Sequence, residues 1–372
     1  MVGYLESVLE IVCKKLQLPE NLYNLAVERY NTIAKTIQQD SEFCSEELNF
    51  YSQGSFRLQT TVKPLSNAEF DLDFVAEIRR DTKMMPEQLY RGIVRVLRSD
   101  GIHKDMVELK SRCIRVVYAN DFHLDIMPGK LLDSSTREII VPDREKKQWY
   151  HHSNPKAYAD WFESRAKQTI QSAYYFSERL RENVEPLSDQ QLSERLEPLR
   201  RAVQLIKRYR DVYCDKTKKE PVRSIVICTL MGEINSNYSS VVQIVQDFCS
   251  YVNQRILVGN GEPFEVRNPV VNELLTEKWK ENKQNYKDFV SMMNELTNDF
   301  RMIISLKNTQ DLNTLLKKMF GEEVIRQAIL SYADKITEQR NEGKLRVNST
   351  GNLGNEVNGT PIKKNTFYGQ KT

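Results

Sequence analysis

Apolar residues recur with two different spacings along the chain, and the change of spacing predicts its elements. Residues 4–16 and 20–38 place apolar side chains three or four positions apart, which predicts two amphipathic helices. From about residue 48, short runs rich in apolar, aromatic and β-branched residues predict strands instead. These runs are NFYSQ, DLDFVAEI, MVELK, CIRVVYA, FHLDIM and REIIV, with one helix expected at 86–98 between the second and third.

The helical spacing returns after about residue 145. We expect helices at 155–182, 189–213, 222–235, 238–254, 273–293, 296–306, 309–319 and 322–340. Strands that cluster early and helices that cluster late predict an α+β fold, in which a helical domain follows a catalytic-type domain. The expected divisions are N-terminal helices at 1–40, a core at 41–150, a helical domain at 151–340 and a flexible, glycine-rich tail at 341–372.

Length and composition limit the class of protein. A chain of 372 residues exceeds one ordinary core and favours two domains. Its formal net charge of +3 gives no global basic field of the kind that nucleic-acid-binding proteins carry. The six cysteines include no CxxC pair, the N-terminus lacks signal-peptide features, and no apolar run reaches the roughly 20 residues of a membrane span. We therefore expect a soluble, cytoplasmic protein with reduced thiols.

Two aspartates, Asp71 and Asp73, lie inside a segment that otherwise has the pattern of a buried strand. Side chains alternate between the faces of a strand, so both carboxylates point to one face while Leu72 and Phe74 point to the other. Unpaired burial of two like charges is costly, and a divalent cation would offset that cost. All-oxygen ligands favour Mg²⁺ or Mn²⁺.

A third aspartate, Asp125, lies in the run FHLDIM, which we expect to end in a turn at Pro128–Gly129. Three strand aspartates on one face can hold two metal ions about 4 Å apart, an arrangement that suits in-line phosphoryl transfer. The alternative is that an Asp-x-Asp pair simply faces water on an edge strand. Gly54–Ser55, ahead of a helical turn at 56–59, favours the metal site, because a glycine and backbone N–H groups at a helix start can receive a phosphate.

The segments GSFRLQTTVKP…EFDLDFV and FHLDIMPG resemble the polymerase-β-type nucleotidyltransferases. Within that superfamily the chain is most similar to the bacterial cGAS/DncV-like nucleotidyltransferases (CD-NTases), relatives of the oligoadenylate synthases. The resemblance is specific over about residues 48–130 and looser through the helical half. It implies a mixed-sheet core capped by helices, with the active site in the cleft between the core and the helical domain.

The resemblance also implies an activity. Enzymes of this family use Mg²⁺ to join nucleoside triphosphates such as ATP and GTP into a short, usually cyclic oligonucleotide. That product activates a partner effector protein in anti-phage defence (CBASS).

The resemblance further implies roles for individual residues. By position, Gly54 and Ser55 match the residues that hold the donor triphosphate. Asp71 and Asp73 match the ligands of both metal ions, and Asp125 matches the carboxylate that helps to activate the acceptor hydroxyl. The family often has glycine where this chain has Gln59, which bears on the shape of the loop after the phosphate site.

Two candidates come from the helical half. Lys207 lies at the edge of an apolar helical stripe, from which a long side chain can place its ammonium in a cleft. Ser224 follows Pro221 at the start of a later helix, and this order resembles the family's pair that contacts the donor phosphates. The alternative is that the basic residues around Lys207 form a solvated face, or attract triphosphates or a polynucleotide activator. Arg57 and Lys63 are further candidates for neutralising phosphate charge.

The pair His151–His152 has a simpler interpretation. Adjacent residues face different ways, so the two imidazoles do not favour one metal ion. We expect the surrounding segment, WYHHSNP, to be a loop at the junction of the domains.

Two other functions remain open. A nucleotidyltransferase with the same core could add nucleotides to an RNA end, or could modify a protein or small molecule. It would need a groove for that acceptor, and the sequence has no recognisable RNA-binding module. A nucleotide-binding regulator without catalysis would be expected to lack a metal ligand, and here all three aspartates are present.

Overall fold

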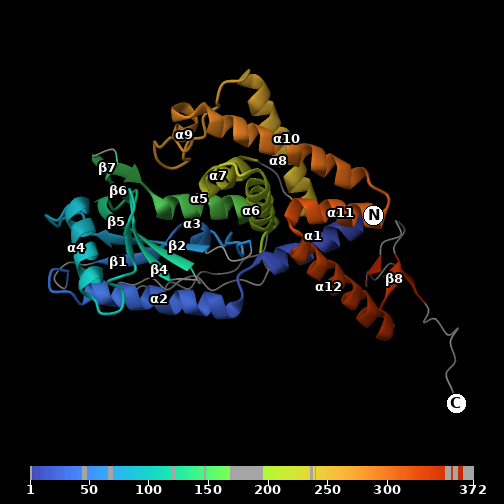
Figure 1. Cartoon of the computed structure of the whole chain (residues 1–372), viewed down its shortest axis with the longest axis horizontal. Coiled ribbons are helices and arrows are strands. Elements are labelled where there is room, and N and C mark those ends of the chain that lie inside the picture. Colours follow the sequence, from blue (N-terminus) through green and yellow to red (C-terminus); the bar gives the residue numbers. More distant parts are fainter. Residues whose placement is uncertain are drawn as a thin grey trace, which may run out of the picture.

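A computed structural model of the chain describes residues 2–43, 48–65, 70–118, 122–145, 148–167, 196–234, 238, 240–347, 353–354 and 359–362 (Figure 1). A strand-bearing part and a helical part lie side by side. Their buried apolar residues form one large cluster under the sheet and another among the helices. This architecture confirms the predicted α+β fold.

Within the described ranges, the early strands form one seven-stranded sheet. They are β1 (Asn49–Ser52), β2 (Phe70–Ile78), β3 (Val107–Leu109), β4 (Ile114–Tyr118), β5 (Phe122–Asp133), β6 (Glu138–Asp143) and β7 (Gln148–Ser153). The order across the sheet is β1-β2-β5-β4-β3, while β6 pairs with the later half of β5 and carries β7. Strands β2 and β5 are parallel and their other pairings are antiparallel, so the sheet is mixed.

Alternation along β2 decides which face of the sheet is buried. Leu72 and Phe74 pack in one cluster with residues of α2 (Glu20–Gln38) and α4 (Pro86–Ser99), and these two helices cover that face. Asp71 and Asp73 therefore lie on the opposite face.

Strand β5 continues through Pro128–Gly129, so the predicted turn there is wrong. On one side Pro128 pairs with Ala76 of β2. On the other side, β5 pairs with β4 up to Ile126 and with β6 from Lys130 onward. Pro128 thus falls where β5 changes partners on that side, and a missing N–H there interrupts neither the pairing with β4 nor that with β6.

The segment predicted as a junction loop is also a strand, β7. His151 pairs with Val141 of β6, and His152 pairs with Ile140. The side chains of the two histidines contact different residues, Glu273 and Glu138, as their adjacent positions predict.

The helical part follows the predicted spacing with local changes. Its helices are α1 (Val2–Leu16), α5 (Pro155–Lys167), α6 (Pro198–Thr217), α7 (Ser224–Glu233), α8 (Val241–Val258), α9 (Glu277–Glu281), α10 (Lys283–Ser305), α11 (Thr309–Phe320) and α12 (Glu322–Asn341). The predicted break between 293 and 296 does not occur, since α10 is continuous there. Residues 168–195, on which parts of two predicted helices fall, lie outside the described residues. Among the helices that the structure describes, none combines the length and apolar character needed to cross a bilayer.

Part of the predicted flexible tail has regular structure. Strands β8 (Arg346–Val347), β9 (Leu353–Gly354) and β10 (Thr360–Pro361) form a small sheet in the order β10-β8-β9. Leu345, just before β8, is only 1% exposed. A buried apolar residue next to paired strands attaches this part of the segment to the fold. The remaining tail residues, 348–352, 355–358 and 363–372, lie outside the described residues.

Candidate active site

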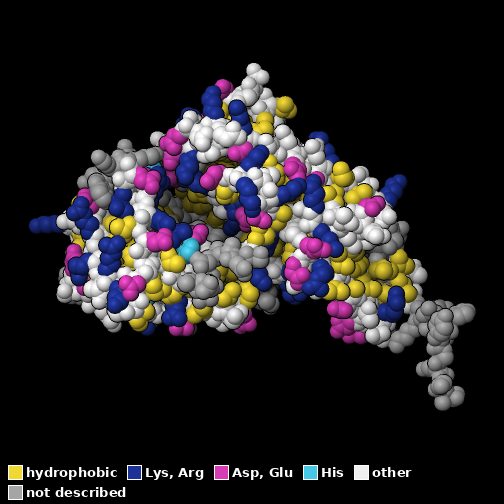
Figure 2. Space-filling view, viewed as in Figure 1, with side chains coloured by type: hydrophobic (Ala, Val, Ile, Leu, Met, Phe, Trp, Pro, Cys, Tyr) yellow, Lys and Arg dark blue, Asp and Glu magenta, His cyan; other side chains and the backbone are white. Residues whose placement is uncertain are grey.

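Asp73 and Asp125 are direct neighbours across the parallel strands β2 and β5. Asp71 lies two residues earlier on β2, on the same face of the sheet, with His123 as its neighbour on β5. The register is specified because a shift by one residue would move the buried side chains of both strands to the wrong face. The structure thus brings the three predicted carboxylates together. The molecular surface is hollowed between the strand-bearing part and the helices (Figure 2).

The predicted phosphate loop lies directly against these carboxylates. Strand β1 leads into the short helix α3 (Gly54–Arg57), and the N–H of Gln53 donates to the carbonyl of Asp73 at 2.9 Å. Gly54 has a φ of +59°, and a β-carbon there would lie 2.5 Å from Oδ2 of Asp73. The hydroxyl of Thr61 donates to that of Ser55 at 3.2 Å. Gly54, Ser55 and the aspartates therefore form one site.

Charge is concentrated at this site. Burial, together with the nearby carboxylates of Asp125 and Asp71, raises the pKa of Asp73 to about 7. Burial also raises the pKa of Asp71, and the guanidinium of Arg115 opposes that rise. Arg115 lies on β4 as the register partner of Asp125. Its Nε and Nη2 each donate to one oxygen of Asp125 at 2.7 Å, and Nη2 lies 3.0 Å from Oδ1 of Asp71.

The chemistry of the carboxylates fits a hard divalent cation. Three aspartates supply only oxygen donors, which suit Mg²⁺ or Mn²⁺ better than a softer metal. The carboxylate of Asp73 is destabilised by its buried position and its like-charged neighbours, and a cation would relieve that repulsion. As arranged here, no three His, Cys, Asp or Glu side chains of the described residues gather closely enough to hold a metal ion. Instead, Asp71 and Asp125 are turned toward Arg115.

Comparison with known proteins agrees with this geometry. Residues 5–166 match the model of the Second Messenger Oligonucleotide or Dinucleotide Synthetase (SMODS) domain. The chain is 29% identical to the c-di-GMP synthase of Roseivirga ehrenbergii, over 98% of this chain and 97% of that protein. It is 25% identical to the cyclic dinucleotide synthase CdnG of Bradyrhizobium diazoefficiens, over 90% of this chain and 85% of that protein. Over most of its length the chain is therefore similar to the cGAS/DncV-like nucleotidyltransferases.

Solved structures of similar proteins share the fold of this chain. Bradyrhizobium diazoefficiens CdnG in complex with GTP matches with a TM-score of 0.70 at 24% identity, over 88% of this chain and 99% of that chain. The Vibrio cholerae cyclic AMP-GMP synthase DncV matches with a TM-score of 0.57 at 16% identity, over 87% of this chain and 86% of that chain. The mixed sheet with covering helices is therefore the polymerase-β-type core that the sequence predicts.

Helix α6 holds the segment that follows Gly54–Ser55, the predicted phosphate loop. Four side chains on one face of α6 donate to backbone carbonyls of residues 58–63. Arg200 donates to Leu58, Gln204 to Thr61 at 3.1 Å, Lys207 to Thr60 at 2.9 Å and Arg208 to Lys63 at 2.8 Å. Leu58 and Val62 of the same segment also belong to the core of the helical part. We call residues 58–63 the strap, because they fasten the phosphate loop to the helical part.

The contacts of the strap bear on two expectations from the sequence. One is that the basic residues around Lys207 form a solvated face, and the other is that Lys207 places its ammonium in a cleft. Arg200, Lys207 and Arg208 are each only 6% exposed, so these basic residues of α6 do not form a solvated face. Burial lowers the pKa of Lys207 to about 8, while Asp73 is near enough to oppose that shift. Lys207 therefore contacts the strap and lies within electrostatic range of Asp73.

The other helical candidate, Ser224, is the first residue of α7. Its hydroxyl accepts from Nη1 of Arg210 at 3.0 Å. Arg210 also donates to the carbonyl of Val222 at 3.0 Å, so it ties the start of α7 to α6. Within the described residues, no hydrogen bond or ion pair of the Ser224 side chain reaches the aspartates directly.

A second junction between the two parts is made of charged side chains. Nε of Arg112 lies 3.0 Å from a carboxylate oxygen of Asp143 in the sheet, and Nη1 lies 3.4 Å from Oε1 of Glu273 in the helical part. Nε2 of His151 lies 3.2 Å from the same oxygen of Glu273. Burial acts to raise the pKa of Glu273, but the contacts with His151 and Asn268 and the charge of Arg112 bring it below its usual value. These contacts therefore connect the sheet to the helical part at a place separate from the strap.

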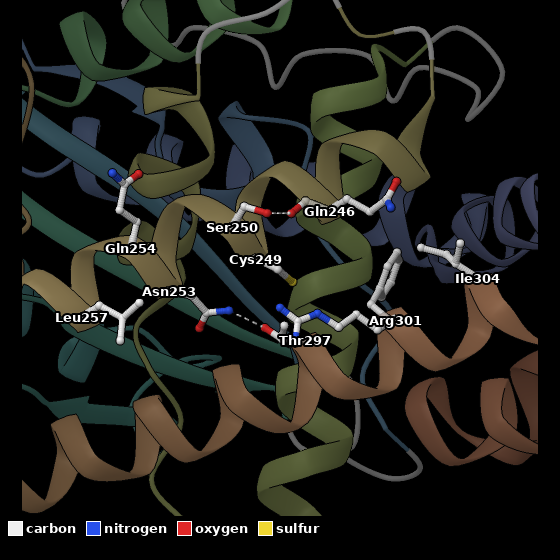
Figure 3. A pocket seen from close by; sticks show the side chains of 10 residues that line it. Gln246, Cys249, Ser250, Asn253, Gln254, Leu257, Thr297, Arg301 and Ile304 are labelled. Atoms are coloured by element: carbon white, nitrogen blue, oxygen red, sulfur yellow. Dashed lines mark hydrogen bonds between the residues drawn. The ribbon is translucent and has the colours of Figure 1, made fainter.

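A hollow of about 510 Å³ lies elsewhere, between α8 and α10 (Figure 3). Asn253 of α8 donates to Thr297 of α10 across it at 2.9 Å. All of its lining residues come from these two helices. It is therefore separate from the aspartates, the phosphate loop and Lys207.

Sequence reasoning predicted Lys207 as a site residue but did not predict Arg115, nor that Arg200, Gln204 and Arg208 would hold the strap together with Lys207. Two signals were available in the sequence. Arg115 is a charged residue between Ile114 and Val116 in a predicted strand, the same pattern that drew attention to the aspartates. Arg200, Gln204, Lys207 and Arg208 have the spacing of one helix face, but nothing local indicated that backbone carbonyls would be their partners.

Proposed function

We propose that this nucleotidyltransferase joins two nucleoside triphosphates, GTP among them, into a cyclic dinucleotide and releases pyrophosphate. The observation that supports this most strongly is the adjacency of Asp73 and Asp125 on parallel strands, with Gly54 in contact distance of Asp73. The relatives named c-di-GMP synthase and cyclic dinucleotide synthase, and the CdnG structure with GTP, support the class of product and the base.

The proposed roles follow from the positions of the side chains. Asp71, Asp73 and Asp125 would hold Mg²⁺, which when bound stabilises charge on the reacting phosphoryl group and lowers the pKa of the attacking hydroxyl. Gly54 leaves room for a phosphate beside Asp73, and Ser55 offers a hydroxyl there. Little covalent chemistry is required of the protein beyond positioning and charge stabilisation.

Lys207 and the strap have a positioning role in this proposal. The protonated Lys207 would add positive charge near the donor triphosphate, while its contact with Thr60 holds the loop that carries Ser55. Two successive attacks by ribose hydroxyls in the same cleft would close the ring. The SMODS match supports a second messenger as the product, and we propose that this messenger acts on an effector protein in anti-phage defence.

The test is direct product analysis. Purified protein is incubated with Mg²⁺ and α-³²P-labelled nucleoside triphosphates, treated with phosphatase, and its products are separated. We expect a phosphatase-resistant dinucleotide that requires GTP, and we expect Asp71→Ala to abolish it. Asp133→Asn is the matched control, because Asp133 lies at the far end of β5 and its carboxylate accepts from Ser135.

Two results would contradict the proposal. If labelled nucleotide is transferred only to added RNA or to a protein, the acceptor is not a second nucleotide. If Asp71→Ala retains full activity, the aspartates are not the reactive centre.

A further inference from the structure

Arg115 has a position that the predicted chemistry does not explain. It lies on β4 directly beside Asp125, and its side chain is 21% exposed while that of Asp125 is 11% exposed. Both oxygens of Asp125 accept hydrogen bonds from the guanidinium at 2.7 Å, and the same group reaches Asp71 at 3.0 Å. A paired, planar contact of this kind is among the strongest hydrogen-bonded ion pairs in proteins.

The contact engages the same atoms that a divalent cation would need. Mg²⁺ and Mn²⁺ bind carboxylate oxygens directly, at distances shorter than any hydrogen bond. A guanidinium that grips both oxygens of Asp125 occupies the approach to that carboxylate, and its charge repels a second cation nearby. The two states of Asp125, bound to arginine and bound to metal, therefore compete.

The surrounding carboxylates explain why a guanidinium would be present at this position. Asp71, Asp73 and Asp125 share one face of two adjacent strands. Without a cation their mutual repulsion would disfavour this arrangement. Arg115 supplies one positive charge where three negative charges meet, and it holds Asp71 and Asp125 at once.

We propose that Arg115 is the resident counter-ion of the aspartate centre, and that a divalent cation must displace its guanidinium from Asp125. This inference rests on the proposed metal-dependent function. Arg115 stabilises the carboxylates before the metal binds, and it weakens the binding of a free metal ion. A cation that arrives with a nucleoside triphosphate also brings phosphate oxygens, which can receive the released guanidinium. Metal and nucleotide would therefore bind better together than the metal alone.

The experiment measures metal binding without nucleotide or turnover. Mn²⁺ is titrated into wild type and Arg115→Met, and free Mn²⁺ is followed by electron paramagnetic resonance. We expect Arg115→Met to bind Mn²⁺ tighter by about tenfold or more, the scale on which neighbouring groups change metal affinity. Arg79→Met is the matched control, since it removes the same charge just beyond the other end of β2, and its affinity should equal that of wild type.

Thermal unfolding gives an independent readout. In EDTA, the melting temperature of Arg115→Met should be lower than that of wild type, because the carboxylates have lost their counter-ion. Addition of Mn²⁺ should raise the melting temperature of Arg115→Met by more than it raises that of wild type. Arg115→Lys serves if the methionine variant does not fold. It keeps the charge but loses the two-pronged contact with Asp125, so its Mn²⁺ affinity should lie between those of wild type and Arg115→Met.

The possible failures are distinguishable. If wild type binds Mn²⁺ and the Arg115 variants bind it equally or more weakly, the counter-ion inference is wrong while the metal centre stands. If neither wild type nor the variants bind Mn²⁺, the proposed metal centre fails and this inference fails with it.

Discussion

Gly54 and Asp73 are in such close contact that a β-carbon on Gly54 would lie 2.5 Å from Oδ2 of the aspartate. The φ of Gly54, +59°, is also one that residues with side chains rarely adopt. Glycine is thus required at this position both by the backbone and by the neighbouring carboxylate. The phosphate loop and the aspartate centre are consequently one geometric unit.

The first prediction follows from this contact. Gly54→Ala must push Asp73 or the loop aside, and a displacement of about 1 Å in a reacting centre can lower activity by roughly 10²-fold. Steady-state rates of product formation measure the effect. Gly101→Ala is the control, because a β-carbon there meets no atom within 4 Å. A Gly54→Ala variant with unchanged kcat/KM would show that the contact does not matter.

The second prediction concerns Asp125. Asp125→Asn keeps the size of the side chain but removes the charge that it contributes beside Asp73. Product formation should fall by at least about 10²-fold, the upper end of the loss produced by residues that only support metal ligands. Circular dichroism should show an unchanged fold, and Asp133→Asn should keep full activity. Equal rates of product formation for wild type and Asp125→Asn would show that Asp125 is not part of the reactive centre.

The third prediction concerns the strap. Arg208→Met removes a donor that is 6% exposed and leaves the carbonyl of Lys63 without that partner. The free energy of unfolding should fall by about 1–3 kcal/mol, as expected for an unsatisfied buried polar group. Urea denaturation measures this loss. The KM for nucleotide should rise more than kcat falls, since the strap positions Ser55.

The matched control for the strap is Lys216→Met on the same helix. The side chain of Lys216 is 62% exposed, so its loss should change stability by no more than about 0.5 kcal/mol. If both variants have the same stability and KM, the contacts of α6 with the strap have no positioning role.

The fourth prediction is a pH dependence. Burial lowers the pKa of Lys207 to about 8, so its ammonium is present below that pH and is lost as the pH rises through it. If this charge binds the triphosphate, kcat/KM should decline above about pH 8, because this ratio reports groups of the free enzyme. Arginine stays charged, so Lys207→Arg should move the decline to higher pH. A decline that stays in place in Lys207→Arg would assign it to another group.

The local sequence determines much of the site. Alternation places Asp71 and Asp73 on the face opposite Leu72 and Phe74, and burial of the apolar face fixes the register. The same reasoning places Asp125 on the face of its own strand opposite Leu124 and Ile126. Gly54 is predictable in the same way, because a glycine before a helical turn permits a backbone conformation that other residues avoid.

Only the tertiary structure decided what these residues contact. The parallel pairing of β2 with β5 joins segments about 50 residues apart in the sequence. No local spacing of residues predicts that Asp73 lies beside Asp125. The course of β5 through Pro128 depended on where its neighbours β4 and β6 end and begin. The partners of Arg115 and Lys207 are likewise set by packing between distant segments. Periodicity reports which face of an element is buried, whereas the identity of the partner depends on how the faces are assembled.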